Sequence, residues 1–296
     1  MRALVTGARG FVGRWLAAHL RDVGDDVVAV DHEVDVTDAT AVRDAVRNAA
    51  PQAIYHLAAF THVGRSWEEP AEALRVNAQG TLCVLEAARA CRPMPTVLLT
   101  SSAEVYGVPA ALPVGEDAPL APVSPYAASK VAAEYLGVQE HLAHGLPVVR
   151  ARPFNHVGPG QSAGFVVAAL ASRIVEAQRS GADVVAVGNL SARRDLTDVR
   201  DVVRAYRLLV ERGEPGQVYN VCSGRDVSVA DVAKRLLALA GASMRLEVDP
   251  ALVRPVDVPV VRGDPGRLQA ATGWRPELDL DHTLRDVLAD WRARRA

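Results

Sequence analysis

Short apolar runs alternate along the chain with longer segments in which apolar residues recur at helical spacing. Runs of this kind, rich in valine, leucine and alanine, are typical of buried strands. They lie at 3–5, 27–30, 53–56, 96–100 and 147–151, and another follows at 217–222. The alternation predicts an α/β fold built on a doubly wound parallel Rossmann sheet.

The order of these runs also predicts a division into two parts. We expect residues 1–153 to form a dinucleotide-binding Rossmann domain, which the chain rejoins at about 189–222. Residues 154–188 and 223–296 are expected to form a smaller α/β lobe that binds the substrate. The proline-dotted segment at 109–125 is interpreted as the rim of the active site, because functional residues gather on loops.

The first apolar run leads into a turn with three glycines, Gly7-Ala-Arg-Gly-Phe-Val-Gly13, and then into a helical segment at 14–23. A strand, a glycine turn and a helix suit a pyrophosphate, because the backbone N–H groups of a helix N-terminus bind anions. The spacing differs from the Gly-x-Gly-x-x-Gly of the standard fingerprint. Asp31 follows the second run, close to where an acid binds the adenosine ribose. A purely structural glycine turn is the alternative.

Two residues disagree about which cofactor is preferred. Asp31 favours NAD, because its carboxylate accepts from a ribose hydroxyl and repels a 2′-phosphate. Arg9, inside the glycine turn, can pair with that phosphate and favours NADP. A direct like-charge contact penalises the phosphate more surely than a flexible arginine rewards it. We therefore expect NAD(H) to be preferred roughly tenfold, or about 1.4 kcal/mol, with NADP(H) possible.

Lysine is rare in this chain, where only Lys130 and Lys234 occur and arginine carries the remaining basic charge. Lys130 lies four residues after Tyr126, so the two side chains share one face of a helix. A nearby cation is expected to lower the pKa of the phenol, as proton transfer at neutral pH requires. The alternative is a surface helix with a solvated lysine.

Composition narrows the class of protein. With 296 residues, 49% of them hydrophobic, the chain can bury one large or two ordinary cores. The net charge of −2 and the lack of a basic block predict no nucleic-acid partner. No apolar run has membrane-spanning length, and the initial strand leaves no room for a signal peptide. Cys83, Cys91 and Cys222 lack metal-ligand spacing and are expected to be reduced thiols of a cytoplasmic protein without a metal site.

Further motifs follow one another in a fixed order. They are Asp35-Val-Thr-Asp38, His56-Leu-Ala-Ala59, Val76-Asn77 with Gly80-Thr81, Ser101-Ser-Ala-Glu-Val-Tyr-Gly107, Tyr126-x-x-x-Lys130 and Arg152-Pro-Phe-Asn155. Together with the glycine turn they resemble the extended short-chain dehydrogenase/reductase family, in its nucleotide-sugar-modifying branch, over nearly the whole chain. The resemblance implies the same two-part layout, with an NAD(P) cofactor and a nucleotide-diphosphate sugar as substrate.

Three later segments narrow the resemblance within this branch. Residues 152–161, 188–201 and 254–259 look most like those of GDP-4-dehydro-6-deoxy-D-mannose reductases, which form GDP-D-rhamnose. This likeness implies NAD(P)H-dependent reduction of the 4-keto group of a GDP-4-keto-6-deoxyhexose.

The resemblance also implies which residues form the site. Ser102 and Tyr126 are expected to act on the sugar carbonyl and Lys130 to hold the nicotinamide ribose, and Glu104 is the fourth candidate catalytic residue. The implied cofactor contacts are Gly7, Arg9, Gly10, Phe11, Val12, Asp31, Asp35, Val36, Leu57, Ala58, Ala59, Tyr126, Lys130 and Pro153. The implied substrate contacts are Ser102, Asn155, Arg194 and Arg254, with the two arginines on the diphosphate.

Glu104 and His62 keep other activities open. Related 4,6-dehydratases carry a glutamate at the position of Glu104. They also resemble this chain at His62. The chain lacks their Asn-His-Glu-Ser segment, however, and has Asn155-His-Val-Gly158 instead. A nucleotide-sugar 4,6-dehydratase or 4-epimerase remains the alternative, and a non-catalytic dinucleotide-binding protein is a remote one.

The helical segments at 70–90 and 126–144 are apolar over more than one face. The resemblance implies that the equivalent helices pair across a two-fold axis into a four-helix bundle. We therefore expect a homodimer.

Overall fold

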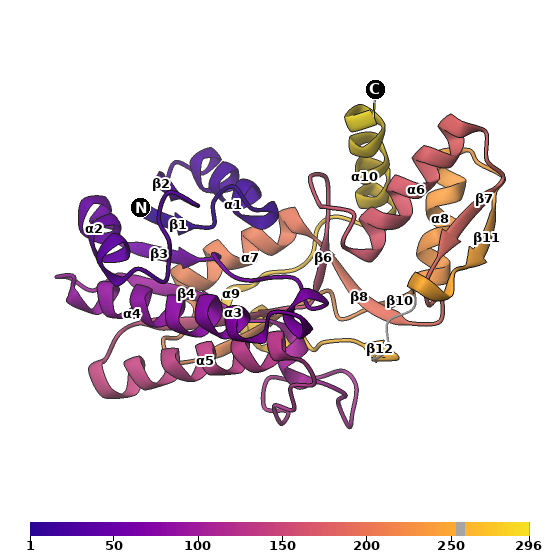
Figure 1. Cartoon of the computed structure of the whole chain (residues 1–296). Coiled ribbons are helices and arrows are strands. Elements are labelled where there is room, and N and C mark those ends of the chain that lie inside the picture. Colours follow the sequence, from indigo (N-terminus) through magenta and orange to yellow (C-terminus); the bar gives the residue numbers. More distant parts are fainter. Residues whose placement is uncertain (253–257, 296) are drawn as a thin grey trace.

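The structure is a computed structural model that describes residues 1–252 and 258–295 (Figure 1). Within this part of the chain, six parallel strands form the central sheet in the order β2-β1-β3-β4-β5-β9. They are β1 (Arg2–Thr6), β2 (Asp26–Val30), β3 (Ala53–His56), β4 (Thr96–Thr100), β5 (Val148–Pro153) and β9 (Val218–Val221). Each predicted apolar run forms one of these strands, so the predicted fold class is confirmed.

The strand order reverses at β1, which lies between β2 and β3. Thr6, at the end of β1, is level with Val30 of β2 and with His56 of β3. Open α/β sheets bind ligands outside the carboxyl ends of their strands at such a switch point. The ends of β1 and β3 are therefore the place to look for the cofactor site.

Helices cover both faces of the central sheet (Figure 1). One face carries α1 (Phe11–Asp22) and α7 (Val199–Arg212), with α9 (Gly266–Thr272) beside α7, around a core that includes Leu16, Tyr206 and Trp274. The other face carries α2 (Ala39–Ala49), α4 (Gly80–Ala90) and α5 (Pro125–His144), around Val46, Leu85 and Leu146. Both cores consist of apolar side chains from strands that are buried on two sides, as parallel strands require.

The predicted helix at 70–90 runs without a break but contains a π-helical turn. Between β3 and α4 the chain forms η1 (Arg65–Trp67), α3 (Pro70–Leu74) and η2 (Arg75–Gln79), of which η2 is a π-helical turn. The turn contains Asn77, whose side-chain amide hydrogen-bonds Phe60 and Ser129 outside the helix. Single π turns of this kind are frequent at functional sites.

A smaller lobe lies on the right of Figure 1, beyond the end of the central sheet. Its strands β6 (Asn155–Val157), β8 (Arg193–Asp198), β10 (Asp226–Ser228) and β12 (Val260–Val261) form one sheet, with β8 in its centre. Strands β7 (Val184–Val187) and β11 (Arg245–Val248) form a second sheet, and η4 (Pro250–Leu252) follows. Helices α6 (Val166–Ser180), α8 (Val229–Ala240) and α10 (Leu280–Arg295) pack together over an apolar core.

The chain crosses between the central sheet and the smaller lobe at residues that differ from those predicted from the sequence. β8 hydrogen-bonds with β6, β10 and β12, so the chain returns to the central sheet at α7 rather than at residue 189. Leu268 of α9 and Trp274 lie in the core of the central sheet, although they fall in the segment assigned to the lobe. Apolar periodicity cannot assign a helix to one of two cores, because both cores demand the same pattern.

Candidate active site

The glycine turn packs tightly against the segment that follows β3. Gly7 has a φ of +67°, and a Cβ atom there would lie 2.7 Å from the backbone nitrogen of Ala58. A Cβ atom on Gly13 would lie 2.1 Å from the carbonyl oxygen of Gly7. Both positions therefore require glycine. At Gly10 a Cβ atom would meet only the carbonyl oxygen of Gly7, at 3.1 Å, so this glycine leaves room above the turn.

The N-terminus of α1 fits a pyrophosphate. Gly10 is the N-cap residue and offers no side-chain cap to the first-turn N–H groups of Phe11, Val12 and Gly13. Such groups have no partner within the helix and bind anions together with the helix dipole. The ring of Phe11 stacks on that of His156 from β6, with centroids 6.0 Å apart and planes 9° apart. This stacking joins the turn to the smaller lobe.

The carboxylate of Asp31 is fixed at the end of β2. It accepts hydrogen bonds from the backbone nitrogens of Arg9 at 2.7 Å and His32 at 2.9 Å. The Arg9 guanidinium is exposed and lies 3.2 Å from the carboxylate of Glu33. Two carboxylates, Asp31 and Glu33, thus stand where the adenosine ribose is expected. Sequence reasoning missed Glu33, because it lies beyond the strand end in an exposed turn.

The other predicted cofactor contacts surround the carboxyl ends of the strands. Asp35 accepts from the backbone nitrogen and the hydroxyl of Thr37, at 2.9 and 2.8 Å. Val36 is buried against Gly80, and a Cβ atom on Gly80 would lie 2.9 Å from Cγ2 of Val36. Leu57, Ala58 and Ala59 follow β3 directly, and Pro153 ends β5.

Ser102, Tyr126 and Lys130 come together at the end of β4. Ser102 caps η3 (Ala103–Tyr106), where its Oγ accepts from the backbone nitrogen of Glu104 at 3.2 Å. Ser124 caps α5 and Pro125 follows it, which starts the helix just before Tyr126. The Tyr126 hydroxyl hydrogen-bonds Ser102, and all three candidate side chains are buried.

The protonation of this cluster differs from the expectation. Burial raises the pKa of Tyr126 to about 12, and the hydrogen bond with Ser102 offsets only part of this rise. The Lys130 ammonium donates to the carbonyl oxygen of Thr100 at 2.9 Å. Burial lowers the pKa of Lys130 to about 8. The prediction that Lys130 lowers the pKa of Tyr126 is therefore wrong for the protein alone, because burial dominates.

The remaining predicted residues lie around this cluster or away from it. Glu104 is half-buried, and its negative charge contributes to the raised pKa of Tyr126. Asn155 is exposed at the start of β6, level with Leu196 of β8. Arg254 lies outside the described residues.

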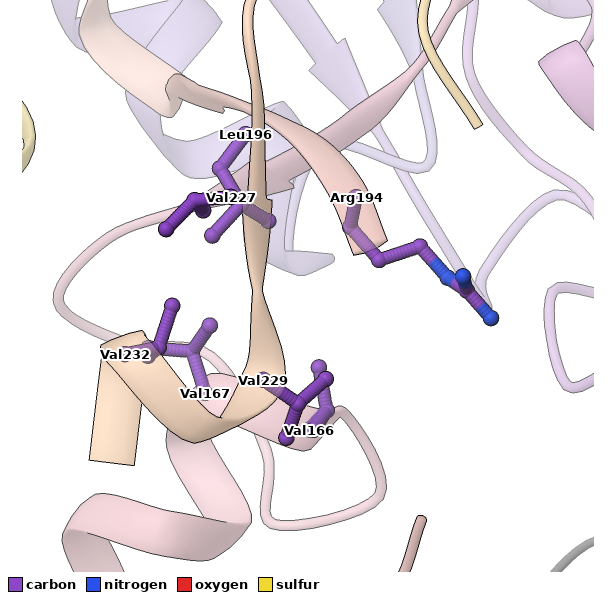
Figure 2. A pocket seen from close by; sticks show the side chains of 7 residues that line it. All are labelled: Val166, Val167, Arg194, Leu196, Val227, Val229 and Val232. Atoms are coloured by element: carbon purple, nitrogen blue, oxygen red, sulfur yellow. The ribbon is translucent and has the colours of Figure 1, made fainter. Parts of the chain in front are cut away.

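Arg194 borders an apolar pocket of the smaller lobe (Figure 2). The pocket is lined by Val166, Val167, Arg194, Leu196, Val227, Val229 and Val232. The guanidinium points away from the apolar side chains, and it donates to the backbone carbonyls of Arg193 and Val258 at 2.8 Å each. The cavity holds only about 10 Å³, which is room for one water molecule and not for a nucleotide base.

The buried ring of His56, to which the sequence analysis gave no role, connects β1 with α4. Thr81 donates its hydroxyl proton to the Asn77 carbonyl at 2.6 Å, so its oxygen is an acceptor towards Nε2 of His56, 3.2 Å away. Nδ1 of His56 then accepts from the hydroxyl of Thr6 at 2.9 Å. Burial lowers the pKa of His56 to about 3, so the ring is neutral, and the bonds place its proton on Nε2.

The chain of hydrogen bonds continues to the catalytic helix. Asn77 donates to the hydroxyl of Ser129 at 2.8 Å, and Ser129 donates to the carbonyl of Tyr126 at 2.7 Å. Ser66 accepts from the backbone nitrogen of Tyr126 at 3.2 Å. The segment after β3 is thereby attached to the first turn of α5. A Cβ atom on Gly164 would lie 3.3 Å from Nε2 of His62, so this segment also reaches the smaller lobe.

The fold and these side chains define the class of protein. A parallel Rossmann sheet, a three-glycine turn and a Tyr-x-x-x-Lys pair beside a serine are the features of a nicotinamide-dependent short-chain dehydrogenase/reductase. A profile of the family described as GDP-mannose 4,6 dehydratase matches residues 29–287, and the chain belongs to this family.

Several relatives match over the full length. The chain is 39% identical to a GDP-6-deoxy-D-mannose reductase of Pseudomonas aeruginosa, over 99% of this chain and 98% of the relative. The structure of RMD from Pseudomonas aeruginosa complexed with NADPH matches with a TM-score of 0.92 and 38% identity, over 99% of this chain and 100% of that one. A Thermus thermophilus UDP-glucose 4-epimerase in complex with NAD matches with a TM-score of 0.88 and 30% identity, over 99% of both chains.

In residues 1–252 and 258–295, His, Cys, Asp and Glu side chains form no group of three or more that could hold a metal ion. Among the described helices, none combines the length and apolar character needed to cross a lipid bilayer.

Proposed function

We propose that the protein reduces the 4-keto group of a GDP-4-keto-6-deoxyhexose with a nicotinamide cofactor. The observation that carries this proposal is the full-length similarity to a GDP-6-deoxy-D-mannose reductase, at 39% identity. The Tyr126 phenol, which is hydrogen-bonded to Ser102, can give the proton that the carbonyl oxygen takes up in reduction.

In this proposal, Tyr126, Ser102 and Lys130 have separate roles in the reduction. The cofactor, when bound, supplies the hydride that the carbonyl carbon accepts. Tyr126 donates its hydroxyl proton to the carbonyl oxygen, which Ser102 also holds by a hydrogen bond. The positive charge of Lys130, on the same helix face, stabilises the phenolate that remains.

The smaller lobe, with residues 154–188 and 223–296, is proposed to bind the nucleotide part of the substrate. Arg194 of β8 supports this, because a guanidinium can pair with a phosphate. Asn155 is proposed to contact the sugar. Arg254 is proposed as a second diphosphate contact.

Cofactor stoichiometry tests the proposed reaction directly. With GDP-4-dehydro-6-deoxy-D-mannose, we expect one equivalent of NADH or NADPH to be oxidised for each equivalent of GDP-6-deoxyhexose formed. A dehydratase would instead convert GDP-mannose without net cofactor consumption, and an epimerase would interconvert two GDP-hexoses. Either result, together with no oxidation of reduced cofactor, would refute the reductase proposal.

Glu104 favours the dehydratase alternative, since its charge contributes to the raised pKa of Tyr126 and it therefore lies near the phenol. A dehydratase needs such a carboxylate as an acid or base. We expect Glu104→Gln to retain reduction within about a factor of ten, because reduction needs no second proton-transfer group. A loss as large as that caused by Tyr126→Phe would reopen the dehydratase alternative.

We also propose that NAD(H) is preferred over NADP(H) roughly tenfold. The carboxylates of Asp31 and Glu33 support this preference, because both would repel a 2′-phosphate, and the Arg9 guanidinium lies 3.2 Å from Glu33. The relatives with known ligands include one with NADPH and one with NAD. Dissociation constants of both cofactors for the wild type, Asp31→Ala and Glu33→Ala test the proposal. Tighter NADP(H) binding by the wild type would contradict it.

A homodimer is proposed as the assembled state. Tyr135 and Leu142, seven residues apart on one face of α5, are 61% and 78% exposed. Leu74, on α3 next to α5, is a further exposed apolar residue. A stripe of exposed apolar side chains on neighbouring helices is typical of a subunit interface.

A further inference from the structure

A fully buried carboxylate continues the row of candidate catalytic residues on α5. Glu134 follows Lys130 by four residues and Tyr126 by eight, so the three side chains share one helix face. The side chain of Glu134 is 0% exposed. A buried charge persists only where partners compensate it, so Glu134 requires cationic or hydrogen-bonding partners.

Two arginines and a serine hold this carboxylate. Arg152 of β5 donates from Nε to Oε1 at 2.8 Å and from Nη2 to Oε2 at 2.7 Å, a bidentate pair. The guanidinium of Arg150 lies 3.6 Å from Oε2. The hydroxyl of Ser101, next to Ser102, donates to Oε1. The carboxylate of Glu134 is therefore held by charge-assisted hydrogen bonds and cannot turn away from these partners.

Arg152 extends the pair to other parts of the site. Its Nη1 donates to the hydroxyl of Tyr106 at 2.9 Å and to the carbonyl of Glu116 at 3.0 Å. Tyr106 ends η3, the turn that Ser102 begins, and Glu116 belongs to the rim at 109–125. One buried ion pair thus contacts α5, η3 and the rim.

Lys130 has a defined charge environment. Glu134 and Tyr126 face it from its own helix, and His56 faces it from β3. His56 is neutral, as its hydrogen bonds and its low pKa indicate. The guanidinium groups of Arg150 and Arg152 lie behind Glu134 on β5. Glu134 is then the negative charge that acts on Lys130.

We propose that Glu134 is a positioning residue that keeps Lys130 protonated, and that Arg152 holds its carboxylate in place for this purpose. The proposal rests on the proposed roles of Tyr126 and Lys130 in reduction. Burial lowers the pKa of Lys130, and Glu134 opposes that shift. Without the carboxylate, the ammonium would lose its proton at lower pH, and the phenolate formed in the reaction would lose its counter-charge.

The scarcity of lysine makes the proposal measurable without substrate. Protein labelled with ¹³C at lysine Cε gives two signals, one from buried Lys130 and one from exposed Lys234 on α8. An NMR titration of the wild type should place the Lys130 pKa at about 8. In Glu134→Gln we expect this pKa to fall by about one unit or more, while the Lys234 titration stays unchanged. An unmoved Lys130 pKa in the folded variant would overturn the proposal.

Glu134→Gln leaves Arg152 buried without its partner, so the single variant is at risk of unfolding. The double variant Glu134→Gln/Arg152→Gln removes both charges and keeps polar partners for each other. The double variant is compared with Arg152→Gln, which loses the same positive charge but keeps Glu134. If Glu134 acts through Lys130, the Lys130 pKa is lower in the double variant than in Arg152→Gln. Equal Lys130 pKa values in these two variants would refute the proposal. Glu140→Gln is the matched control, because Glu140 is a buried acid on α5 paired with Arg89 instead.

Kinetics separate this proposal from the proposed reaction. The alkaline limb of kcat/KM should move to lower pH in the single and double variants, by the same shift as the Lys130 titration. The rate at pH values below that limb should change far less than the position of the limb. If no variant or wild type oxidises reduced cofactor with the keto-sugar, the proposed function fails, and the titration still decides the role of Glu134.

Discussion

Burial acts in opposite directions on the two residues of the Tyr-x-x-x-Lys pair. It raises the pKa of Tyr126 to about 12 and lowers that of Lys130 to about 8. At neutral pH the phenol therefore holds its proton, and the ammonium is the group that is easier to deprotonate. A site prepared in this way is ready to give a proton to a carbonyl oxygen.

Replacing Tyr126 by phenylalanine removes the proposed proton donor and little else. We expect turnover to fall by a factor of about a hundred or more, as the loss of a general acid does, with cofactor affinity nearly unchanged. Steady-state kinetics and cofactor titration of the purified variant measure both quantities. Tyr135→Phe makes the same chemical change nine residues further along α5 at an exposed position and should leave turnover unchanged. Near-normal turnover of Tyr126→Phe would exclude Tyr126 from the mechanism.

The pKa of Lys130 predicts how activity depends on pH. The ammonium is present below about pH 8 and is lost above it, so kcat/KM of the wild type should decline above about pH 8. The profile of kcat/KM is the appropriate measurement, because it reports groups of the free enzyme. A profile that stays level up to about pH 10 would show that the charge of Lys130 is not needed.

Among the elements, the glycine turn tolerates substitution least. A Cβ atom on Gly13 would lie 2.1 Å from the Gly7 carbonyl oxygen and 2.8 Å from Cα of Ala8, which are both backbone atoms that cannot move aside. We expect Gly13→Ala to lower the free energy of unfolding by more than about 3 kcal/mol and to abolish cofactor binding. Chemical denaturation and cofactor titration provide the two measurements.

Gly115 is the matched control for this substitution. A Cβ atom there would meet nothing within 4 Å, and Gly115 lies in the rim at 109–125 outside the turn. Gly115→Ala should change the free energy of unfolding by less than about 0.5 kcal/mol. Equal stability losses in the two variants would mean that the close approach within the turn is not what requires glycine.

The sequence predicts those elements whose environment is uniform. The strands of the central sheet other than the edge strand β2 are buried on both faces, so a continuous apolar run such as Val97 to Leu99 marks each of them. β8 is not predicted in this way, because Leu196, which packs against the core of the lobe, is preceded by three charged residues, Arg193, Arg194 and Asp195. The π turn at Arg75–Gln79 is not predicted either, and it holds Asn77, whose side chain contacts other elements.

The same limit applies to the candidate site. Tyr126 and Lys130 are four residues apart, so helix geometry alone brings them together. Glu134 and Arg152 are joined by the pairing of α5 with β5, and the contact of His56 with Thr6 depends on the order of the strands. Contacts between residues on different elements need the tertiary structure. Their burial also determines the pKa of Tyr126, where sequence reasoning expected the wrong sign.

At the scale of the whole molecule, the exposed stripe on α5 predicts assembly. The change Leu142→Glu places a charge in the proposed apolar interface, and it should convert a dimer to a monomer at micromolar concentration. Sedimentation velocity provides the measurement. Val248→Glu, a charge at a similarly exposed apolar residue of β11 in the smaller lobe, should leave the dimer intact. A wild type that sediments only as a monomer would refute the dimer.

The central sheet and the smaller lobe are not successive segments of the chain. The chain passes from one to the other at 153–155, 198–199, 221–226 and 261–266. Leu268 and Trp274, which follow the last of these crossings, complete the core beneath the central sheet. A chimera that takes the lobe of another enzyme must therefore be spliced at every crossing, and a truncation after β9 would leave the central sheet without part of its own interior. In this enzyme, the two parts cannot be recombined by joining two pieces end to end.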